Sequence, residues 1–291
     1  MRLAYYALGG GLGHLVRARA FLHTLGLDDQ AVILTASDYA SDRRVVGDIE
    51  MAVAPTSLQQ VPGALRDWTL QQLARVHATH LCVDVFPAGI LGELCDLPRD
   101  LPIEFWHVAR LLQWSAYAPC IAGLPPRFRR TFRTEALSAP HAQFLDAHSD
   151  EVLDLTLVDP PLVQAEVTAS ESYWLVVHSG PQAEVAQLLA YADEIRTIES
   201  ADVPLWVISA NAPAQLPPQT RVLDVYPASP YFAAARRIFS AAGFNIMRQT
   251  SACRDKHSVM SMPRRFDDQA TRARLARRRL AFEKASCTGD L

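Results

Sequence analysis

Several features that would set a clear functional class are missing from this sequence. No apolar run reaches the roughly 18 residues that a membrane-spanning helix needs. No Cys-x-x-Cys pair occurs and the five cysteines form an odd set, which argues against a disulfide framework or a zinc site and favours a reducing compartment. The amino-terminal segment lacks an apolar signal region followed by a small-residue cleavage site. We therefore expect a cytoplasmic protein, with contact at the inner membrane face left open.

The charge balance and the length set the broad class. The net charge of −3 gives no electrostatic reason to expect nucleic-acid binding. Hydrophobic residues make up 49% of the chain and charged residues 20%, as in folded globular proteins. The 291 residues suffice for two domains.

The first half of the chain alternates between expected strands and helices. Residues 2–8 form a nearly unbroken apolar run that ends in glycines, which is typical of a strand buried in a parallel sheet. Apolar residues then recur at helical spacing from Leu15 to Leu25. A second helix is expected over 65–76, and the further strands are expected at 31–36, 51–54, 80–86 and 103–108. This alternation indicates a doubly wound sheet.

The pattern then restarts in the second half. A strand is expected at 173–178, and others at 204–209, 221–225, 237–240 and 257–262. The segment 159–172 has a proline pair and no apolar periodicity, so we place a linker there. The prediction is an α/β protein with domains at 1–165 and 166–291. Each domain is a Rossmann-like, doubly wound parallel sheet, and the two face a central cleft.

A glycine-rich loop joins the first expected strand to the first helix, and its members are Gly9, Gly10, Gly11, Gly13 and His14. Such a loop lets an anionic group approach a helix amino terminus, although a tight turn without a ligand is the plain alternative. His14 stands where a dinucleotide-binding loop would have its third glycine, so NAD is a poor fit. An imidazole at this position can act as a general base, contact the ligand, or serve only the structure.

Two further candidates follow strands of the first domain. Asp84 ends the expected strand at 80–86, and Arg110 follows the strand at 103–108. Each also has a purely structural interpretation: Asp84 could cap a loop or helix, and Arg110 could be an ordinary surface arginine. The segment 126–133 mixes four arginines with two phenylalanines, which suits either a solvated surface helix or contact with an anionic membrane.

The carboxy-terminal region holds the densest set of candidates. Residues 240–243 are small and precede a helix expected near Phe244, an arrangement suited to a diphosphate. Ser240 and Gly243 would let such a ligand approach the chain closely, and the polar residues Asn245, Arg248 and Gln249 lie on the first turns of the expected helix. A second group, Asp267, Asp268 and Gln269, offers acceptors and an amide to sugar hydroxyls. Ordinary helix capping is the alternative for the two aspartates.

These motifs, in this order, resemble the GT-B glycosyltransferases related to the N-acetylglucosaminyltransferase that makes lipid II. The resemblance is carried by residues 9–14, 84–94, 240–249 and 263–269. It implies a glycosyltransferase that needs no bound metal or other cofactor and inverts the anomeric centre. It also implies that the carboxy-terminal domain holds the nucleotide-sugar.

The resemblance assigns roles to individual residues. His14 and Asp84 become the catalytic candidates, with Gly10, Gly11, Gly13 and Arg110 on the acceptor side. Ser179, Gly180, Asn211 and Tyr226 join the donor-binding set, near the phosphates, ribose or base. By its spacing, Gln249 occupies the position where the family often has a glutamate that binds the ribose. An amide bonds a hydroxyl more weakly than a carboxylate does, so the resemblance implies a lower donor affinity at this position.

The function expected from these observations is transfer of a sugar from a UDP-linked donor to a hydroxyl acceptor. The acceptor is not identified by the sequence, and a lipid-linked acceptor and a polysaccharide both stay open. Two alternatives stay open on the same scaffold: a non-catalytic nucleotide-sugar-binding protein and a nucleotide-sugar epimerase.

Overall fold

The structure is a computed structural model that describes residues 1–98, 100–161 and 172–288. The described residues divide into two compact units. Unit 1 comprises Met1–Pro161 together with Arg265–Asp267, and unit 2 holds the described residues 172–264 and 268–288. The domain boundary predicted between residues 165 and 166 lies outside the described residues.

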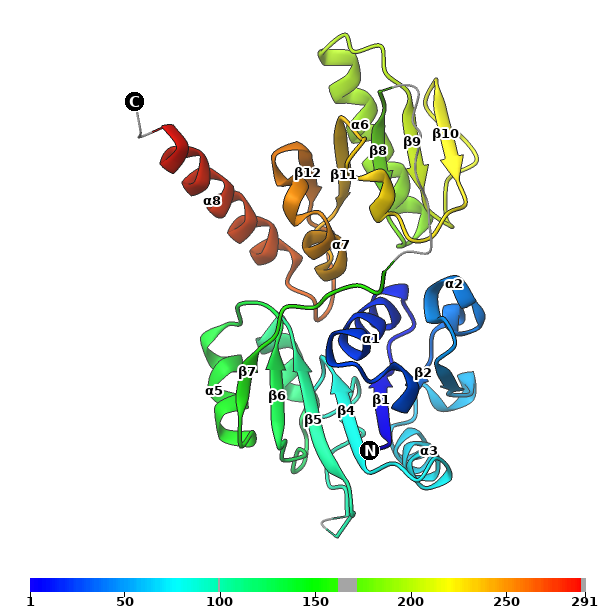
Figure 1. Cartoon of the computed structure of the whole chain (residues 1–291), viewed down its shortest axis with the longest axis vertical. Helices are drawn as coiled ribbons and strands as arrows, with labels where there is room; N and C mark the ends of the chain where they lie inside the picture. The colour runs from blue at the N-terminus through cyan, green and yellow to red at the C-terminus, as the bar shows by residue number, and fades with distance from the viewer. Residues whose placement is uncertain (99, 162–171, 289–291) are drawn as a thin grey trace. The chain divides into compact units, whose positions relative to one another are not determined.

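Unit 1 is built on a parallel sheet of seven strands (Figure 1). The strands are β1 (Leu3–Ala7), β2 (Ala31–Thr35), β3 (Glu50–Val53), β4 (His80–Asp84), β5 (Glu104–Ala109), β6 (Arg130–Arg133) and β7 (Val152–Asp154). Its helices are α1 (Leu12–Leu25), α2 (Arg43–Val46), α3 (Pro62–Arg75), α4 (Trp114–Tyr117) and α5 (Ala139–His148). All five residues of β1 are buried, as an unbroken apolar run in a central parallel strand requires.

The strand order of unit 1 brings two loops together. The order is β3-β2-β1-β4-β5-β6-β7, so the chain winds outward from β1 in one direction and then, from β4, in the other. Tyr5 of β1 pairs in register with Cys82 of β4. The topological switch point lies between these two strands, and ligands of doubly wound sheets bind outside the carboxyl ends of the strands at such a point. The loops after β1 and β4 flank it.

Unit 2 repeats the same order with five parallel strands. They are β8 (Trp174–Val177), β9 (Leu205–Ile208), β10 (Thr220–Leu223), β11 (Arg237–Ala241) and β12 (His257–Met260), arranged β10-β9-β8-β11-β12. The helices are α6 (Gln182–Ile198), α7 (Phe244–Gln249) and α8 (Gln269–Thr288). Its switch point lies between β8 and β11, so the loops after those two strands are the ones expected to meet a ligand.

The sheet of unit 2 has an apolar layer on each face, because alternate residues of a strand point to opposite sides. Trp174 and Val176 of β8 pack with α6, whereas Tyr173 and Leu175 pack with Trp206 on the other face. The rings of Tyr173 and Trp206 stack with centroids 3.9 Å apart. The expected fold class, two doubly wound parallel-sheet units, is confirmed.

The segment 126–133 is not the surface helix that we expected. Residues 130–133 form β6, and Phe128 and Phe132 are buried against the sheet. Two arginines of the segment, Arg127 and Arg129, form ion pairs with Asp150. Burial does not alternate along these four residues, since Thr131 and Phe132 are both buried, so no period-two pattern marks the short strand in the sequence. Among the described residues, no helix is long and apolar enough to cross a membrane.

Candidate functional site

His14 and Asp84 meet at the switch point of unit 1. His14 lies in the first turn of α1, and Asp84 is the last residue of β4. His14 Nδ1 is 2.6 Å from Asp84 Oδ2. Because a carboxylate only accepts hydrogen bonds, His14 Nδ1 carries the proton and Nε2 is left with its lone pair. Nε2 makes no hydrogen bond within the described part of the chain, and the His14 side chain keeps 16% of its surface exposed.

Asp84 is buried and fully hydrogen-bonded. Arg17 donates from Nε to Oδ1 at 2.6 Å and from Nη2 to Oδ2 at 2.5 Å. Tyr5 donates its hydroxyl to Oδ1 at 2.8 Å. With the His14 bond, the carboxylate accepts four hydrogen bonds, about as many as its lone pairs allow. This set fixes the position and charge of Asp84.

The electrostatics of this cluster follow from burial and from Arg17. Burial works to raise the pKa of Asp84, but Arg17 and the hydrogen bonds to His14 and Arg17 outweigh it and hold that pKa well below its usual range. Burial lowers the pKa of His14, Asp84 opposes this, and the charges of Arg17 and Arg110 add to the lowering. At neutral pH the cluster therefore holds an anionic Asp84, a cationic Arg17 and a neutral His14.

The backbone around the cluster is specialised. Val85, directly after Asp84, has φ of +68° although it is β-branched and fully buried. Such a conformation costs about 1–3 kcal/mol and persists only where the surroundings enforce it. Val85 donates its N–H to Val108 O at 2.9 Å and accepts a hydrogen bond from His107 Nε2 at 3.2 Å. These bonds hold the turn that follows Asp84.

Gly9 makes room for the His14 ring. A Cβ atom at Gly9 would lie 2.1 Å from both Cδ2 and Nε2 of His14, closer than any real contact. The same test at Gly10 and Gly11 finds no atom within 4 Å. The glycine loop thus has one position where a side chain is excluded by the ring, and others where the chain faces open space. Gly13 lies in the first turn of α1 and is exposed.

Arg110, directly after β5, is 7% exposed and forms an ion pair with Asp267. Asp267 belongs to the segment Arg265–Asp267 that joins unit 1, where it also bridges to Leu112. Phe266 of the same segment packs edge-on against Phe86 and Tyr117, with centroids 5.6 Å away in each case. Phe86 lies 6.1 Å from the His14 ring. Asp267, which we predicted to read the donor sugar, is therefore engaged with Arg110.

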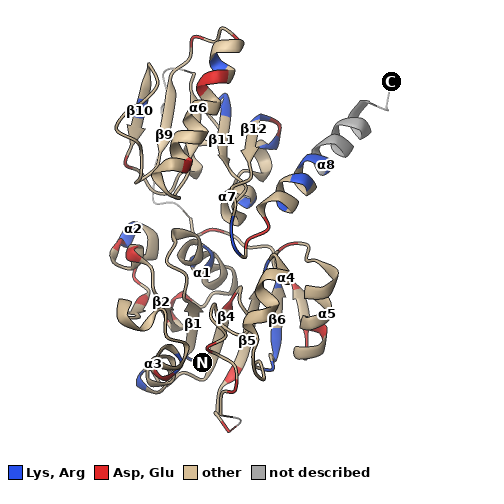
Figure 2. Ribbon diagram, turned by 180° about the vertical axis from the view of Figure 1, so that it is seen from behind, with Lys and Arg blue, Asp and Glu red and all other residues tan. Residues whose placement is uncertain are grey.

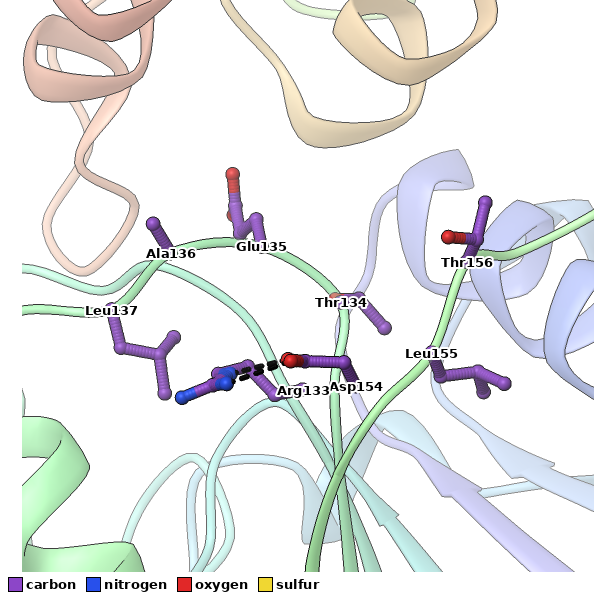
Figure 3. A pocket seen from close by; sticks show the side chains of 8 residues that line it. All are labelled: Arg133, Thr134, Glu135, Ala136, Leu137, Asp154, Leu155 and Thr156. Atoms are coloured by element: carbon purple, nitrogen blue, oxygen red, sulfur yellow. Dashed lines mark hydrogen bonds and ion pairs between the residues drawn. The ribbon is translucent and has the colours of Figure 1, made fainter.

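A pocket of about 490 Å³ lies beyond the ends of β6 and β7 (Figure 3). Its polar groups are largely committed to the protein itself. Arg133 pairs with Asp154 at 2.6 Å, Thr134 donates to Ala109 O at 2.9 Å, and Glu135 accepts from Leu111 N at 2.9 Å. We therefore assign no ligand to this pocket.

In unit 2, an ion cluster lies beside the loop after β8. Glu184, in the first turn of α6, accepts from Arg264 Nη1 at 2.5 Å and Nη2 at 2.6 Å. His178 Nε2 lies 2.7 Å from Glu184 Oε2. Arg264 and His178 lower the pKa of Glu184 against the effect of burial. The predicted donor contact Gly180 lies within this loop, and a Cβ there would be 2.3 Å from His178 Nε2.

Asn211 and Gly180 are joined, as adjacent strand ends permit. Asn211 Nδ2 donates to Gly180 O at 2.9 Å. Both Asn211 and Ser179 are exposed, so their surfaces are open to a ligand. Tyr226 follows β10 and is half-buried. The structure thus brings Gly180 and Asn211 to one loop cluster, with Ser179 beside them in the chain.

Ser240, expected to contact a bound donor, instead directs its hydroxyl to partners within unit 2. Ser240 is fully buried, and its hydroxyl bonds His257 Nε2 at 2.8 Å and Ala241 O at 2.9 Å. Its side chain therefore serves the interior of unit 2. Gly243 caps α7, and the half-buried residues Asn245, Arg248 and Gln249 lie on that short helix.

Asp268 and Gln269 open α8. Asp268 Oδ1 accepts from Thr271 N at 3.0 Å, which is an amino-terminal cap, the alternative left open by the sequence. Gln269 is 5% exposed and its Oε1 accepts from Met262 N at 3.0 Å. Figure 2 marks basic positions of α8 in blue. Arg272 of this helix is buried and donates to Ala242 O at 2.9 Å.

The geometry unites part of the predicted site. His14 and Asp84 are in direct contact, whereas Asp267 and Asp268, although adjacent in sequence, serve different units. Sequence reasoning missed Arg17 and Tyr5. The signal for Arg17 was an arginine three residues after His14 on a helix face otherwise filled by apolar residues, since a buried arginine needs an ionic partner.

Among residues 1–98, 100–161 and 172–288, no group of three or more His, Cys, Asp and Glu side chains could hold a metal ion.

Comparison with known proteins gives a match in structure only. No family model matches the chain, and no curated protein matches it in sequence. The solved structure of spinosyn forosaminyltransferase matches at TM-score 0.64 and 10% identity, over 96% of this chain and 84% of that chain. Spinosyn rhamnosyltransferase with thymidine diphosphate matches at TM-score 0.56 and 12% identity, over 91% and 81%.

A third similar structure is a UDP-glucose:anthocyanidin 3-O-glucosyltransferase in complex with UDP. It matches at TM-score 0.56 and 11% identity, over 94% of this chain and 83% of that chain. Identities this low establish the fold alone. The chain has the fold of the GT-B glycosyltransferases, as its motifs predicted.

Proposed function

We propose that this protein is a glycosyltransferase that moves a sugar from a nucleotide-sugar to a hydroxyl group of an acceptor. The observation that carries the proposal is the hydrogen bond from His14 Nδ1 to the buried Asp84, which leaves Nε2 as a base at the switch point of unit 1. The GT-B fold supports it, and the similar structures include complexes with UDP and with thymidine diphosphate.

The proposed reaction is a single inverting displacement. The acceptor oxygen forms a bond to the anomeric carbon, and the bond from that carbon to the diphosphate oxygen breaks. The acceptor proton passes to His14 Nε2, and the nucleoside diphosphate leaves. A positioned base contributes about 10²–10⁴-fold to such a step. Asp84 holds the ring in the tautomer whose Nε2 can accept the proton.

Unit 2 is the proposed donor-binding unit. The loops after β8 and β11 flank its switch point, where a nucleotide is expected to bind. Ser179 and Gly180 belong to the first loop, and Asn211 bonds Gly180 from the loop after β9. Gly243 and the polar side chains of α7 follow β11 and belong to the second loop. We propose a UDP-linked donor and no requirement for a bound metal, with main-chain N–H groups and basic side chains offsetting the charge of the leaving diphosphate.

The test is a transfer assay with purified protein. UDP- and thymidine diphosphate-linked sugars are combined with acceptors from three classes: small hydroxyl compounds, polysaccharides and lipid-linked saccharides. Product mass reports transfer, and anomeric coupling constants in the product report inversion or retention. Transfer that survives EDTA supports the metal-independent mechanism, and transfer that stops with EDTA and returns with a divalent cation contradicts it.

A non-catalytic nucleotide-sugar-binding protein is the second candidate. It is favoured by the inward use of Ser240 and Gln269, whose polar atoms bond the protein and are not offered to a donor. Binding of UDP, seen as a rise in thermal stability, without turnover across the acceptor panel would support it. A product with altered stereochemistry in the nucleotide-sugar itself would point to the epimerase alternative.

The predicted cytoplasmic location and contact with the inner membrane face stay predictions. Co-sedimentation with vesicles of anionic and neutral lipid tests the membrane contact directly.

A further inference from the structure

Arg17 is an unusual neighbour for a histidine–carboxylate pair. It is 2% exposed and lies on the same face of α1 as His14, three residues later. Its guanidinium forms a bidentate ion pair with Asp84, donating to one carboxylate oxygen at 2.6 Å and to the other at 2.5 Å. Such bidentate pairs combine charge with fixed geometry.

One oxygen of Asp84 accepts hydrogen bonds from both Arg17 and the His14 ring. Arg17 Nη2 and His14 Nδ1 both bond Oδ2, and the two nitrogens are 3.1 Å apart. Both nitrogens carry protons toward Oδ2, so their closeness is tolerated because they share an anionic acceptor. Any positive charge added to the ring would arise beside the positive guanidinium.

The cluster of Asp84, Arg17 and His14 carries no net charge in its resting state. Asp84 contributes −1 and Arg17 contributes +1, so the sum is zero while His14 is neutral. Protonation of His14 would leave a net positive charge in a largely buried cluster, which is costly. Arg110, from the end of β5, adds a further repulsion, whereas Asp84 is the group that attracts the proton. Tyr5, from β1, is a neutral donor, because burial and Asp84 raise its pKa well above the usual value.

We propose that Arg17 is a positioning residue that keeps His14 neutral, with its proton on Nδ1, by cancelling the charge of Asp84. A histidine paired with an uncompensated carboxylate would gain a proton readily and lose its function as a base in mildly acidic conditions. With Arg17 present, Asp84 orients the ring through its hydrogen bond but offers it little net negative charge. The inference rests on the proposed role of His14 as the base.

The first experiment follows the His14 ring by NMR as pH is varied. His14 is assigned by the signal missing in His14→Gln. In Arg17→Met the pKa of His14 is expected to rise by at least one unit, and in Arg17→Lys, which keeps the charge, by clearly less. Arg19→Met is the matched control, since it removes one positive charge from the same helix without contact to Asp84, and its His14 titration is expected to match wild type.

Activity provides the second readout. The acidic limb of kcat/KM for transfer is expected to move to higher pH in Arg17→Met by the same amount as the ring titration. At a pH one unit below the new pKa about one ring in eleven is neutral, against one in two at the pKa itself, so activity there is expected to be about fivefold lower than at the midpoint. A purely structural role for Arg17 would lower activity equally at every pH.

A third variant keeps the inference testable if Arg17→Met does not fold. Asp84→Asn removes the negative charge and leaves Arg17 in place, so the pKa of His14 is expected to fall below the wild-type value. An unchanged or higher value in Asp84→Asn, or an unchanged value in a folded Arg17→Met, overturns the inference. The titration needs no turnover: shifted titrations in a protein that transfers no sugar would overturn the proposed function and leave the role of Arg17 intact.

Discussion

His14 and Asp84 stand 70 residues apart in sequence, and Nδ1 of the first lies 2.6 Å from Oδ2 of the second. The contact exists because β1 and β4 are neighbours at the switch point of their sheet, so the loop after one strand meets the end of the other.

Replacing His14 with Gln is expected to lower kcat for transfer by about 10²–10⁴-fold, because the base is lost. Donor affinity is expected to stay within a factor of about three, since the proposed donor site lies in unit 2. Steady-state kinetics with isothermal titration of UDP separates the two effects. His23→Gln, on the same helix and half-exposed, is the control. A wild-type rate in His14→Gln would exclude His14 as the base.

Gly9→Ala is expected to displace the His14 ring, because the new methyl group would lie 2.1 Å from Cδ2 and Nε2. The expected result is loss of the Nδ1 proton signal that reports the bond to Asp84, together with a fall in kcat. Gly10→Ala meets no atom within 4 Å, so it is expected to keep that NMR signal. If both variants retain the signal, the close approach of Gly9 to the ring is wrong.

Asp267→Asn is expected to destabilise the protein by about 1–3 kcal/mol, less than a fully buried pair would, since the Asp267 side chain is 16% exposed. The reason is that Arg110, itself 7% exposed, would lose its ionic partner. Urea unfolding measures the loss. Asp268→Asn, one residue later, alters only a helix cap, and its cost is expected to be below about 1 kcal/mol. If Asp267 reads the donor sugar as the sequence suggested, KM for the donor will rise in Asp267→Asn while stability stays near wild type.

Two buried histidines of unit 1 are expected to make stability fall in acid. Burial lowers the pKa of His107 to about 4, and burial with the charges of His107 and Arg110 lowers that of His141 to about 3. In the unfolded chain both return to about 6.5, so the unfolded state binds more protons at lower pH. The stability that these neutral rings contribute is complete above pH 6.5 and is lost as pH falls toward 4 and 3, on the order of 3 kcal/mol for each ring.

His141→Leu tests that dependence. Neither ring nitrogen of His141 has a hydrogen-bond partner within the described residues, so an apolar side chain is expected to leave stability at pH 7 within about 1 kcal/mol of wild type. Between pH 6.5 and 4 the slope of unfolding free energy against pH is expected to fall by up to one proton. His148→Gln, at the end of the same helix, is the control. The same slope in His141→Leu and wild type would refute the assignment.

Much of the fold follows from local pattern in the sequence. The apolar runs that became β1, β4 and β8 are continuous because those strands are covered on both faces, and such runs are easily recognised. β6 and β7 escaped because they are short strands toward the edge of the sheet, with arginine and aspartate at exposed positions. Their polar residues pair across neighbouring strands, a stabilisation that single-strand periodicity does not reveal.

The site was predictable in its chemistry and not in its partners. His14 and Asp84 were predicted because strand ends carry ligand-binding groups in parallel sheets, and the structure places the two side chains in contact. Arg17 and Tyr5 were missed because their importance depends on which strand lies beside β1. The positive φ of Val85 was equally hidden, since a left-handed turn normally announces itself by glycine. Ser240 and Gln269 were misplaced toward the ligand because sequence alone does not say which way a polar side chain turns.

Because residues Arg265–Asp267 pack as part of unit 1, the two units cannot be separated by a single cut in the chain. A fragment truncated at Pro161 would leave Phe86 and Tyr117 without the ring of Phe266, and Arg110 without its carboxylate. Expressed alone, that fragment is expected to be less stable and to aggregate through the uncovered aromatic rings. Grafting the tripeptide back through a short linker after Pro161 would be the way to obtain an independently folded half.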